Sequence, residues 1–348
     1  MSLYAFVVVV FLMNSLPLPA MVVHADWSKN SNKRWMAKAV LNNDGLYTME
    51  PPDKVGDTQG LLKQLRLAAG DTGCVFVGFD FPIGLPFAFA ERCGIDDFLE
   101  FLLHCGEGEW QDFFEVANSP QEISLHRPFY PNRPGSARQI HLLNALGMEN
   151  TDQLRRKCEL ASENRPAASP LFWTLGGQQV GKATINGWRE VLIPALQDMQ
   201  HSANIKIWPF SAKLSHLLMP QNVVIAETYP AEFYTHLNVD LRLTYQDSQI
   251  QESSSKSPKY GKRSQASRMA NSDTLLGWVK AHSIHISPDL SCLIQNGFGP
   301  RSKSEDEFDA LIGVFGMLNI IFGNREPGDP LDPRSSSIEG WILGQQPH

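Results

Sequence analysis

Three short apolar runs in this chain each end in a carboxylate, and this feature restricts the fold more than any other. The runs are Ala20–Asp26, Cys74–Asp80 and Val223–Glu227. Their β-branched residues and flanking Pro and Gly predict buried strands of the parallel type. An acid at the end of a buried strand is costly unless a partner neutralises it. Because ligands bind at the carboxyl ends of strands in open α/β sheets, the three acids predict a functional edge.

The segments between these runs predict the rest of an α/β domain. Strands are expected over Trp35–Leu41 and Leu46–Glu50, and a helix over Thr58–Ala69, where leucines recur at helical spacing. The segment from about 87 to 203 predicts helices separated by Pro- and Gly-rich loops. These helices are expected over Asp96–His104, Trp110–Ala117, Thr151–Ser162 and Trp188–Met199. We therefore predict one α/β domain over 20–348, a mixed sheet flanked by helices, with a largely helical insertion at about 87–203.

The last predicted helix, Glu305–Phe322, opens with a cluster of acids. Asp306 and Asp309 are three residues apart and so share one face of that helix. Acids in a first turn also interact favourably with the helix dipole, so capping is an alternative role for this pair. A structural role is likewise open for Glu227, which could pair with an arginine.

Together, the strand-end acids and the helix-start acids predict a metal site. Carboxylates gathered at one edge repel one another unless a divalent cation balances them. Oxygen ligands select Mg²⁺ or Mn²⁺ over zinc, and one or two such ions can activate water for phosphodiester hydrolysis. We expect three acids to be both catalytic and metal-binding, namely Asp26, Asp80 and Asp309. Two further acids are expected as metal ligands, Glu227 and Asp306.

The charge balance excludes a protein that coats nucleic acid through its overall charge. The chain has 30 Lys and Arg against 37 Asp and Glu, a net charge of −7, so a polyanion must meet a local basic patch or a bound metal. The Ser- and Lys-rich segment 246–271 predicts a mobile basic loop. Its Lys262 and Arg263 lead into a helix and are candidates for binding substrate phosphates. Lys182 is a third candidate, although its Gly-Lys pair lacks the frame of a phosphate-binding P-loop.

The cysteines and the N-terminal segment bear on location. Five cysteines without C-x-x-C spacing argue against a disulfide framework or a zinc site. Residues 1–19 predict an N-terminal extension or a misplaced start. Its apolar run is too short for a membrane span, and no basic residue precedes it as in a signal peptide. We expect a cytoplasmic protein; export is the alternative if residues 1–25 are a signal peptide.

Beyond these patterns, the chain resembles family 429 of the domains of unknown function, whose members are described as predicted ribonuclease H-like nucleases. The resemblance extends from about Val22 to Gln345. The matching segments are Ala25–Ser28, Gly78–Gly84, Arg127–Pro131, Gln179–Lys182, Ile207–Phe210, Ala226–Pro230, Glu305–Ala310 and Glu339–Gly344. The family pattern does not need the N-terminal extension, and the resemblance implies that Asp26 belongs to the mature protein. The Asp306-x-x-Asp309 pair is also similar to that of Holliday-junction resolvases.

The resemblance implies a ribonuclease H-like mixed sheet and a metal-dependent nuclease that acts on DNA or RNA. Two other functions stay open. An actin-like phosphotransferase or ATPase shares the strand order, but it normally has Gly-rich phosphate loops where this chain has Trp27-Ser28-Lys29 after Asp26. A non-catalytic nucleic-acid-binding module could occupy the same fold.

Overall fold

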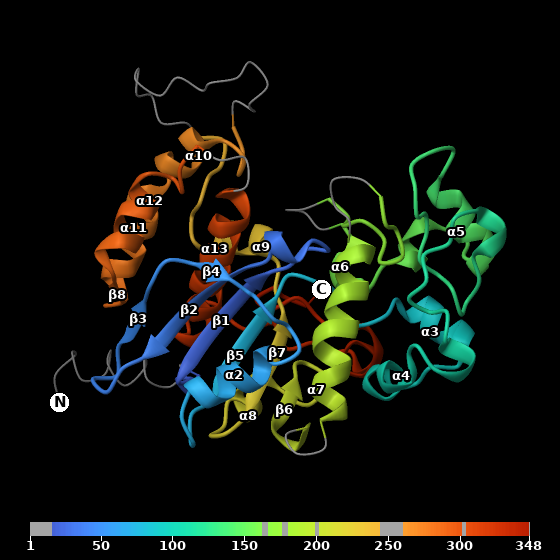
Figure 1. The fold of residues 1–348 in the computed structure, drawn as a ribbon, viewed down its shortest axis with the longest axis horizontal. Helices are drawn as coiled ribbons and strands as arrows, with labels where there is room; N and C mark the ends of the chain where they lie inside the picture. The colour runs from blue at the N-terminus through green and yellow to red at the C-terminus, as the bar shows by residue number, and fades with distance from the viewer. Residues whose placement is uncertain are drawn as a thin grey trace.

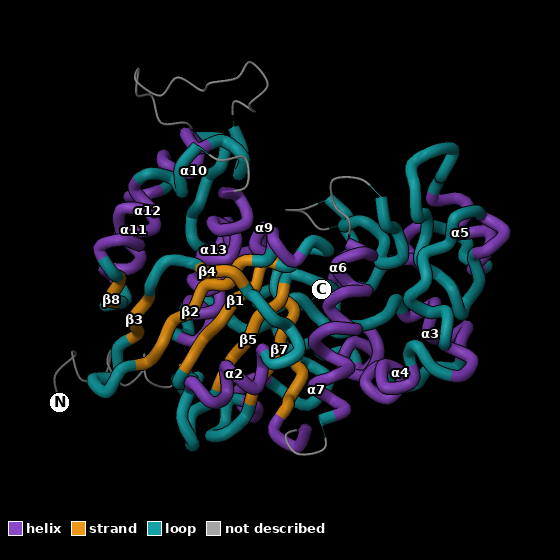
Figure 2. The backbone as a smooth tube through the Cα atoms, in the orientation of Figure 1, coloured by secondary structure: helices purple, strands orange, loops and turns teal. Residues whose placement is uncertain are grey.

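The protein, seen here in a computed structural model, forms one eight-stranded mixed sheet with helices on both faces (Figures 1 and 2). The structure describes residues 16–161, 166–175, 180–198, 202–243, 260–300 and 304–347. The strands are β1 (Met21–Asp26), β2 (Trp35–Leu41), β3 (Tyr47–Met49), β4 (Asp53–Lys54), β5 (Val75–Phe79), β6 (Ile205–Ile207), β7 (Val223–Glu227) and β8 (His285–Ile286). The predicted mixed α/β sheet flanked by helices is therefore confirmed.

The sheet places the three carboxylate-ending strands side by side. Its order is β6-β7-β5-β1-β2-β3-β8, and β4 also pairs with β2. β5 lies between β1 and β7 and is parallel to both, whereas β2 runs antiparallel to β1. The three runs thus end at the same edge of the sheet, as their sequence pattern predicts.

Helices cover both faces of the sheet, and α3, α4 and α5 lie beside it (Figure 1). The helices are α2 (Leu61–Ala68), α3 (Phe87–Cys93), α4 (Phe98–His104), α5 (Gln139–Leu146), α6 (Val180–Gly187), α7 (Ile193–Gln197), α8 (Leu214–Leu217), α9 (Pro230–His236), α10 (Gln265–Ala270), α11 (Ser272–Ala281), α12 (Pro288–Gln295) and α13 (Ser304–Ile321). Side chains alternate across the sheet, so neighbouring residues of β1 enter different cores. Val23 packs with α2 and the insertion, and Val22 packs with α9 and α13.

The insertion lies beside the sheet (Figure 1) and is less helical than predicted. The helices expected over Trp110–Ala117 and Thr151–Ser162 are wrong: the structure has only short 3₁₀ turns, η2 (Gly108–Trp110), η4 (Thr151–Leu154) and η5 (Lys157–Glu159). In the first segment, the adjacent Phe113 and Phe114 are both buried, which one face of a surface helix does not allow. In the second, the side chain of Asn150 caps a single turn.

The last helix of the insertion is irregular, and some predictions lie outside the described residues. The helix expected over Trp188–Met199 consists of a π-helical turn, η6 (Trp188–Leu192), followed by α7. Residues 1–15 of the predicted extension and residues 246–259 of the predicted basic loop are not described. Within the described end of that loop, Gln265–Ala270 form the helix α10, so the loop prediction is wrong there, and the side chain of Ser264 caps this helix. Among the described residues, no helix combines the length and apolar character needed to cross a membrane.

A close contact fixes α13 against β1. A Cβ atom built on Gly313 would lie 2.0 Å from Cγ of His24, so only glycine permits this approach. His24 is fully buried, and burial lowers its pKa to about 3, which keeps the ring neutral. Asp309 precedes Gly313 by one helical turn, and Asp26 follows His24 by two strand residues. The contact therefore brings the start of α13 to the end of β1.

We expect Gly313→Ala to lower the free energy of unfolding by about 2 kcal/mol or more, because the methyl group overpacks the contact with His24. The matched control is Gly277→Ala in α11, where a Cβ atom would meet nothing within 4 Å. That control should raise stability by about 0.5–1 kcal/mol through helix propensity. Urea unfolding monitored by circular dichroism measures both. Equal stability of Gly313→Ala and the wild type would contradict the packing described.

Candidate metal centre

Strand register brings Asp26 and Asp80 together. Ala25 of β1 is paired with Phe79 of β5. The residue that follows each of them is an aspartate, so Asp26 and Asp80 lie next to each other at the edge of the sheet. The backbone N–H of Asp80 donates to the carbonyl of Ala25 at 3.2 Å. Since side chains alternate, both aspartates leave the sheet on the side of His24, which is the side covered by α13.

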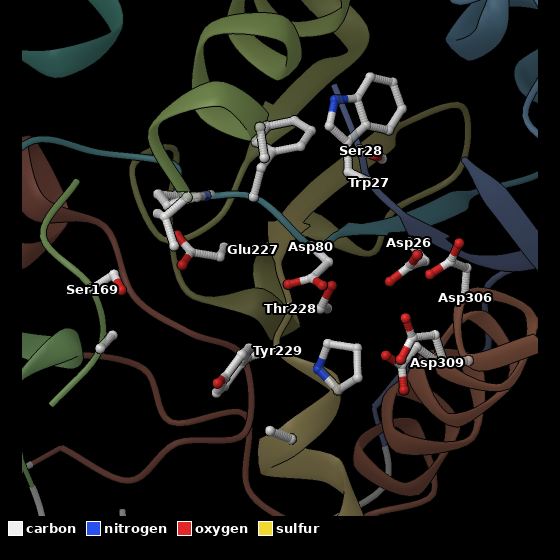
Figure 3. A pocket seen from close by; sticks show the side chains of 18 of the residues that line it. Asp26, Trp27, Ser28, Asp80, Ser169, Glu227, Thr228, Tyr229, Asp306 and Asp309 are labelled. Atoms are coloured by element: carbon white, nitrogen blue, oxygen red, sulfur yellow. The ribbon is translucent and has the colours of Figure 1, made fainter. Parts of the chain in front are cut away.

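Asp309 joins them from the first turns of α13. Figure 3 shows Asp26, Asp80 and Asp309 directed toward a common space, with Asp306 beside them. Asp309 is 1% exposed, and both of its carboxylate oxygens are engaged. The Tyr234 hydroxyl donates to Oδ1, and the Lys262 ammonium donates to Oδ2 at 2.5 Å. The structure thus brings together four of the five acids predicted as metal ligands.

The electrostatics of these acids reflect burial and crowding. Burial, followed by the charges of Asp309, Asp80 and Asp306, raises the pKa of Asp26 well above its ordinary value. Burial also raises the pKa of Asp80 to about 7, with Lys262 acting against the shift. Burial and the neighbouring Glu305 raise the pKa of Asp306 to about 6. Each shift means that the ionised form of the acid is disfavoured, first by burial and then by the negative charges of its neighbours.

Lys262 supplies part of that charge from outside the sheet. Burial opposes the charge of its ammonium, yet Asp309, Asp26 and Asp80 together raise its pKa above the ordinary value. The sequence predicted Lys262 as a phosphate-binding residue, and the structure places it among the carboxylates. A single ammonium carries half the charge of a divalent ion, so the cluster keeps an excess of negative charge.

Glu227 lines the same cleft as the other acids but lies apart from them within it (Figure 3). Its strand register pairs it with Phe79 rather than with Asp80, so its side chain leaves the opposite face of the sheet. Both of its oxygens bind the fully buried guanidinium of Arg156, each at 2.6 Å, and the N–H of Ile83 donates at 2.7 Å. This is the ion pair that the sequence left open as an alternative to metal binding.

The acids lie in a cleft of about 760 Å³ whose lining also includes basic residues. Lys29 and Lys33 line it from the β1–β2 connection. Lys182 lies near Lys29, and burial together with that neighbour lowers the pKa of Lys182. Arg263 also lines the cleft, but its guanidinium is paired with Glu305 at 3.0 Å. The three predicted phosphate-binding residues therefore all lie in or beside one cleft with the acids.

The donor chemistry of the site suits a hard cation. Carboxylate oxygens are the ligands that Mg²⁺ and Mn²⁺ prefer. The hydroxyl of Thr228, which is 1% exposed and lines the cleft beside Asp80, has no hydrogen-bond partner in the described part of the chain. As they stand, no three His, Cys, Asp or Glu side chains within the described ranges form a ready-made metal-binding group. The chemistry of these residues fits such an ion, and Asp26 and Asp80 are the residues that would hold it.

The comparisons with known proteins found no relative of this chain. The chain matches no protein family model, no curated protein and no solved structure. The resemblance to family 429 accordingly stays a prediction from eight short segments.

The sequence did not reveal several residues of the site. Tyr234 lies in α9 with no pattern that marks it. Arg156 was placed inside a predicted helix, and nothing in the sequence links it to Glu227, which is 71 residues away. Lys29 and Lys33 belong to no motif, although their position in the connection that follows a strand-end aspartate is a usable signal.

Stability should depend on pH through Asp80. Its folded pKa of about 7 exceeds the ordinary value, so the folded state retains a proton that the unfolded state releases. Protonated Asp80 therefore contributes to the free energy of unfolding. This contribution is complete below the unfolded pKa of about 4 and is lost as the pH rises to the folded pKa of about 7. We expect Asp80→Asn to stabilise the metal-free protein at pH 8, by about 2 kcal/mol, and to have little effect near pH 4.

Urea unfolding in EDTA at the two pH values measures this difference, with Asp44→Asn in the exposed β2–β3 turn as the control. The control should leave stability unchanged at both pH values. If Asp80→Asn changed the free energy of unfolding equally at pH 4 and pH 8, the pKa of Asp80 could not be raised as described.

Proposed function

We propose that the protein is a metal-dependent nuclease with a ribonuclease H-like fold. One observation carries the proposal: carboxylates from β1, from the end of β5 and from α13 converge in a cleft and lack compensating charge. The strand order supports the fold assignment, since β3-β2-β1-β5-β7 has three antiparallel strands followed by two that are parallel to the first.

The proposed ligands are Asp26 and Asp80, with Asp309 and Asp306 close by. Glu227 is left out of this set because Arg156 engages both of its oxygens. A divalent ion held here supplies Lewis-acid stabilisation to a phosphodiester and activates water. Asp309 holds the ammonium of Lys262 in the cleft, where it can neutralise a phosphate oxygen.

The surroundings of the acids favour a polyanion as substrate. Lys29, Lys33 and Lys262 line the same cleft, and Lys182 lies next to Lys29. The acids that line the cleft outnumber these bases, so a nucleic-acid backbone would be bound by the lysines together with a divalent ion that balances the acids. A phosphotransferase is less well supported, because the turn after Asp26 is filled by Trp27 and Lys29 rather than by glycines that admit phosphates.

The test is incubation of the protein with single-stranded, duplex and branched DNA and RNA in the presence of Mg²⁺, Mn²⁺ or EDTA. We expect hydrolysis of at least one substrate with metal and none in EDTA. Asp26→Asn should reduce the rate by more than about 100-fold, because even outer-shell partners of metal ligands contribute 10–100-fold. It should also weaken Mg²⁺ binding while leaving the fold intact, since one buried like charge is removed.

Asp44→Asn is the control and should retain full activity. Hydrolysis that continues in EDTA, or in Asp26→Asn, would refute the mechanism. Unfolding of Asp26→Asn, combined with a wild type that metal never stabilises, would make Asp26 a structural acid. The nucleic-acid-binding module would then be the better description.

A further inference from the structure

Lys262 donates to one of the three aspartates of the candidate metal centre. The ammonium lies 2.5 Å from Oδ2 of Asp309, and Tyr234 engages Oδ1. Both carboxylate oxygens of Asp309 therefore already accept a hydrogen bond. Asp26 and Asp80 face the same space, and no donor among the described residues forms a hydrogen bond to their carboxylates. The site thus has one carboxylate that is hydrogen-bonded to a cation and two that are not.

The position of Lys262 is built into the fold. Its carbonyl accepts a hydrogen bond from Arg268, a residue that is 1% exposed. The same guanidinium donates to the carbonyls of Gly297 at 2.8 Å and Gly299 at 3.0 Å. Ser264 then caps α10 directly after the turn. The backbone that carries the ammonium is consequently held from two sides.

We propose that Lys262 is a resident cation that takes the place of a second divalent ion, so that the centre binds one Mg²⁺ or Mn²⁺ per chain. This inference rests on the proposed function and makes it more specific. The lysine stays on Asp309, and the single divalent ion is held by Asp26 and Asp80.

The charges agree with this assignment. Three ionised carboxylates carry three negative charges, and the ammonium leaves two, which a single divalent ion neutralises. A second divalent ion would leave an excess of positive charge. Asp306 is left out of this count because it is only half-buried, so that solvent as well as the nearby Lys33 balances part of its charge. Thr228, with its unpartnered hydroxyl, lies beside Asp80, on the side where the ion is expected.

The experiment is a titration with Mn²⁺, in which calorimetry gives the stoichiometry and electron paramagnetic resonance counts the free ion. The wild type should bind one Mn²⁺ per chain. Lys262→Met removes the charge at similar length and should bind two. Lys262→Arg keeps the charge and should bind one. Arg263→Met is the matched control: it removes a neighbouring cation that pairs with Glu305 instead of the three aspartates, and it should also bind one.

The outcomes separate this inference from the proposed function. Two ions in the wild type would overturn the inference and leave the nuclease proposal standing. A folded Lys262→Met that still binds one ion would also overturn it. No ion in the wild type would overturn both. Circular dichroism confirms the fold of each variant, and the wild-type stoichiometry decides the question even if Lys262→Met does not fold.

Discussion

Repulsion between buried carboxylates is the constraint around which this molecule is arranged. Asp26 and Asp309 are almost inaccessible to solvent, and Asp80 is next to both, so ionising all three costs free energy that the fold must recover elsewhere. The protein recovers part of it with one ammonium and one phenolic hydroxyl. Purely structural acids would be fully paired, as Glu227 is with Arg156. The incomplete compensation of the aspartates is the reason for proposing their site as the functional one.

The architecture produces this arrangement through strand alternation and one glycine. Because side chains alternate along a strand, Asp26 and Asp80 lie on the face that α13 covers, whereas Glu227 lies on the other face. Gly313 then allows α13 to approach His24 closely enough that Asp309 reaches the end of β1. The same packing separates two charge systems that the sequence alone treats as one. One is the ion pair between Glu227 and Arg156, which joins the insertion to the sheet. The other is the group of three aspartates, Asp26, Asp80 and Asp309.

The sequence predicts the parts of this account that depend on local patterns. Strand β2 matches its predicted range residue for residue, and the strand-end aspartates lie together because parallel strands end at a common edge. The sequence could not separate Glu227 from Asp80, because the face that a strand-end residue occupies depends on register with a neighbour. It also could not supply Arg156, whose partner is 71 residues away. The insertion was predicted poorly because its aromatic residues pack on several sides, which hides any helical periodicity.

The most direct test of the account is a crystal structure of the protein grown with Mn²⁺ and measured at a wavelength that reveals the ion by anomalous scattering. The account predicts a single anomalous peak within coordination distance of Asp26 and Asp80, with the ammonium of Lys262 still bound to Asp309. A cleft without a peak at saturating Mn²⁺ would contradict it, as would an ion bound at Glu227 in place of Arg156.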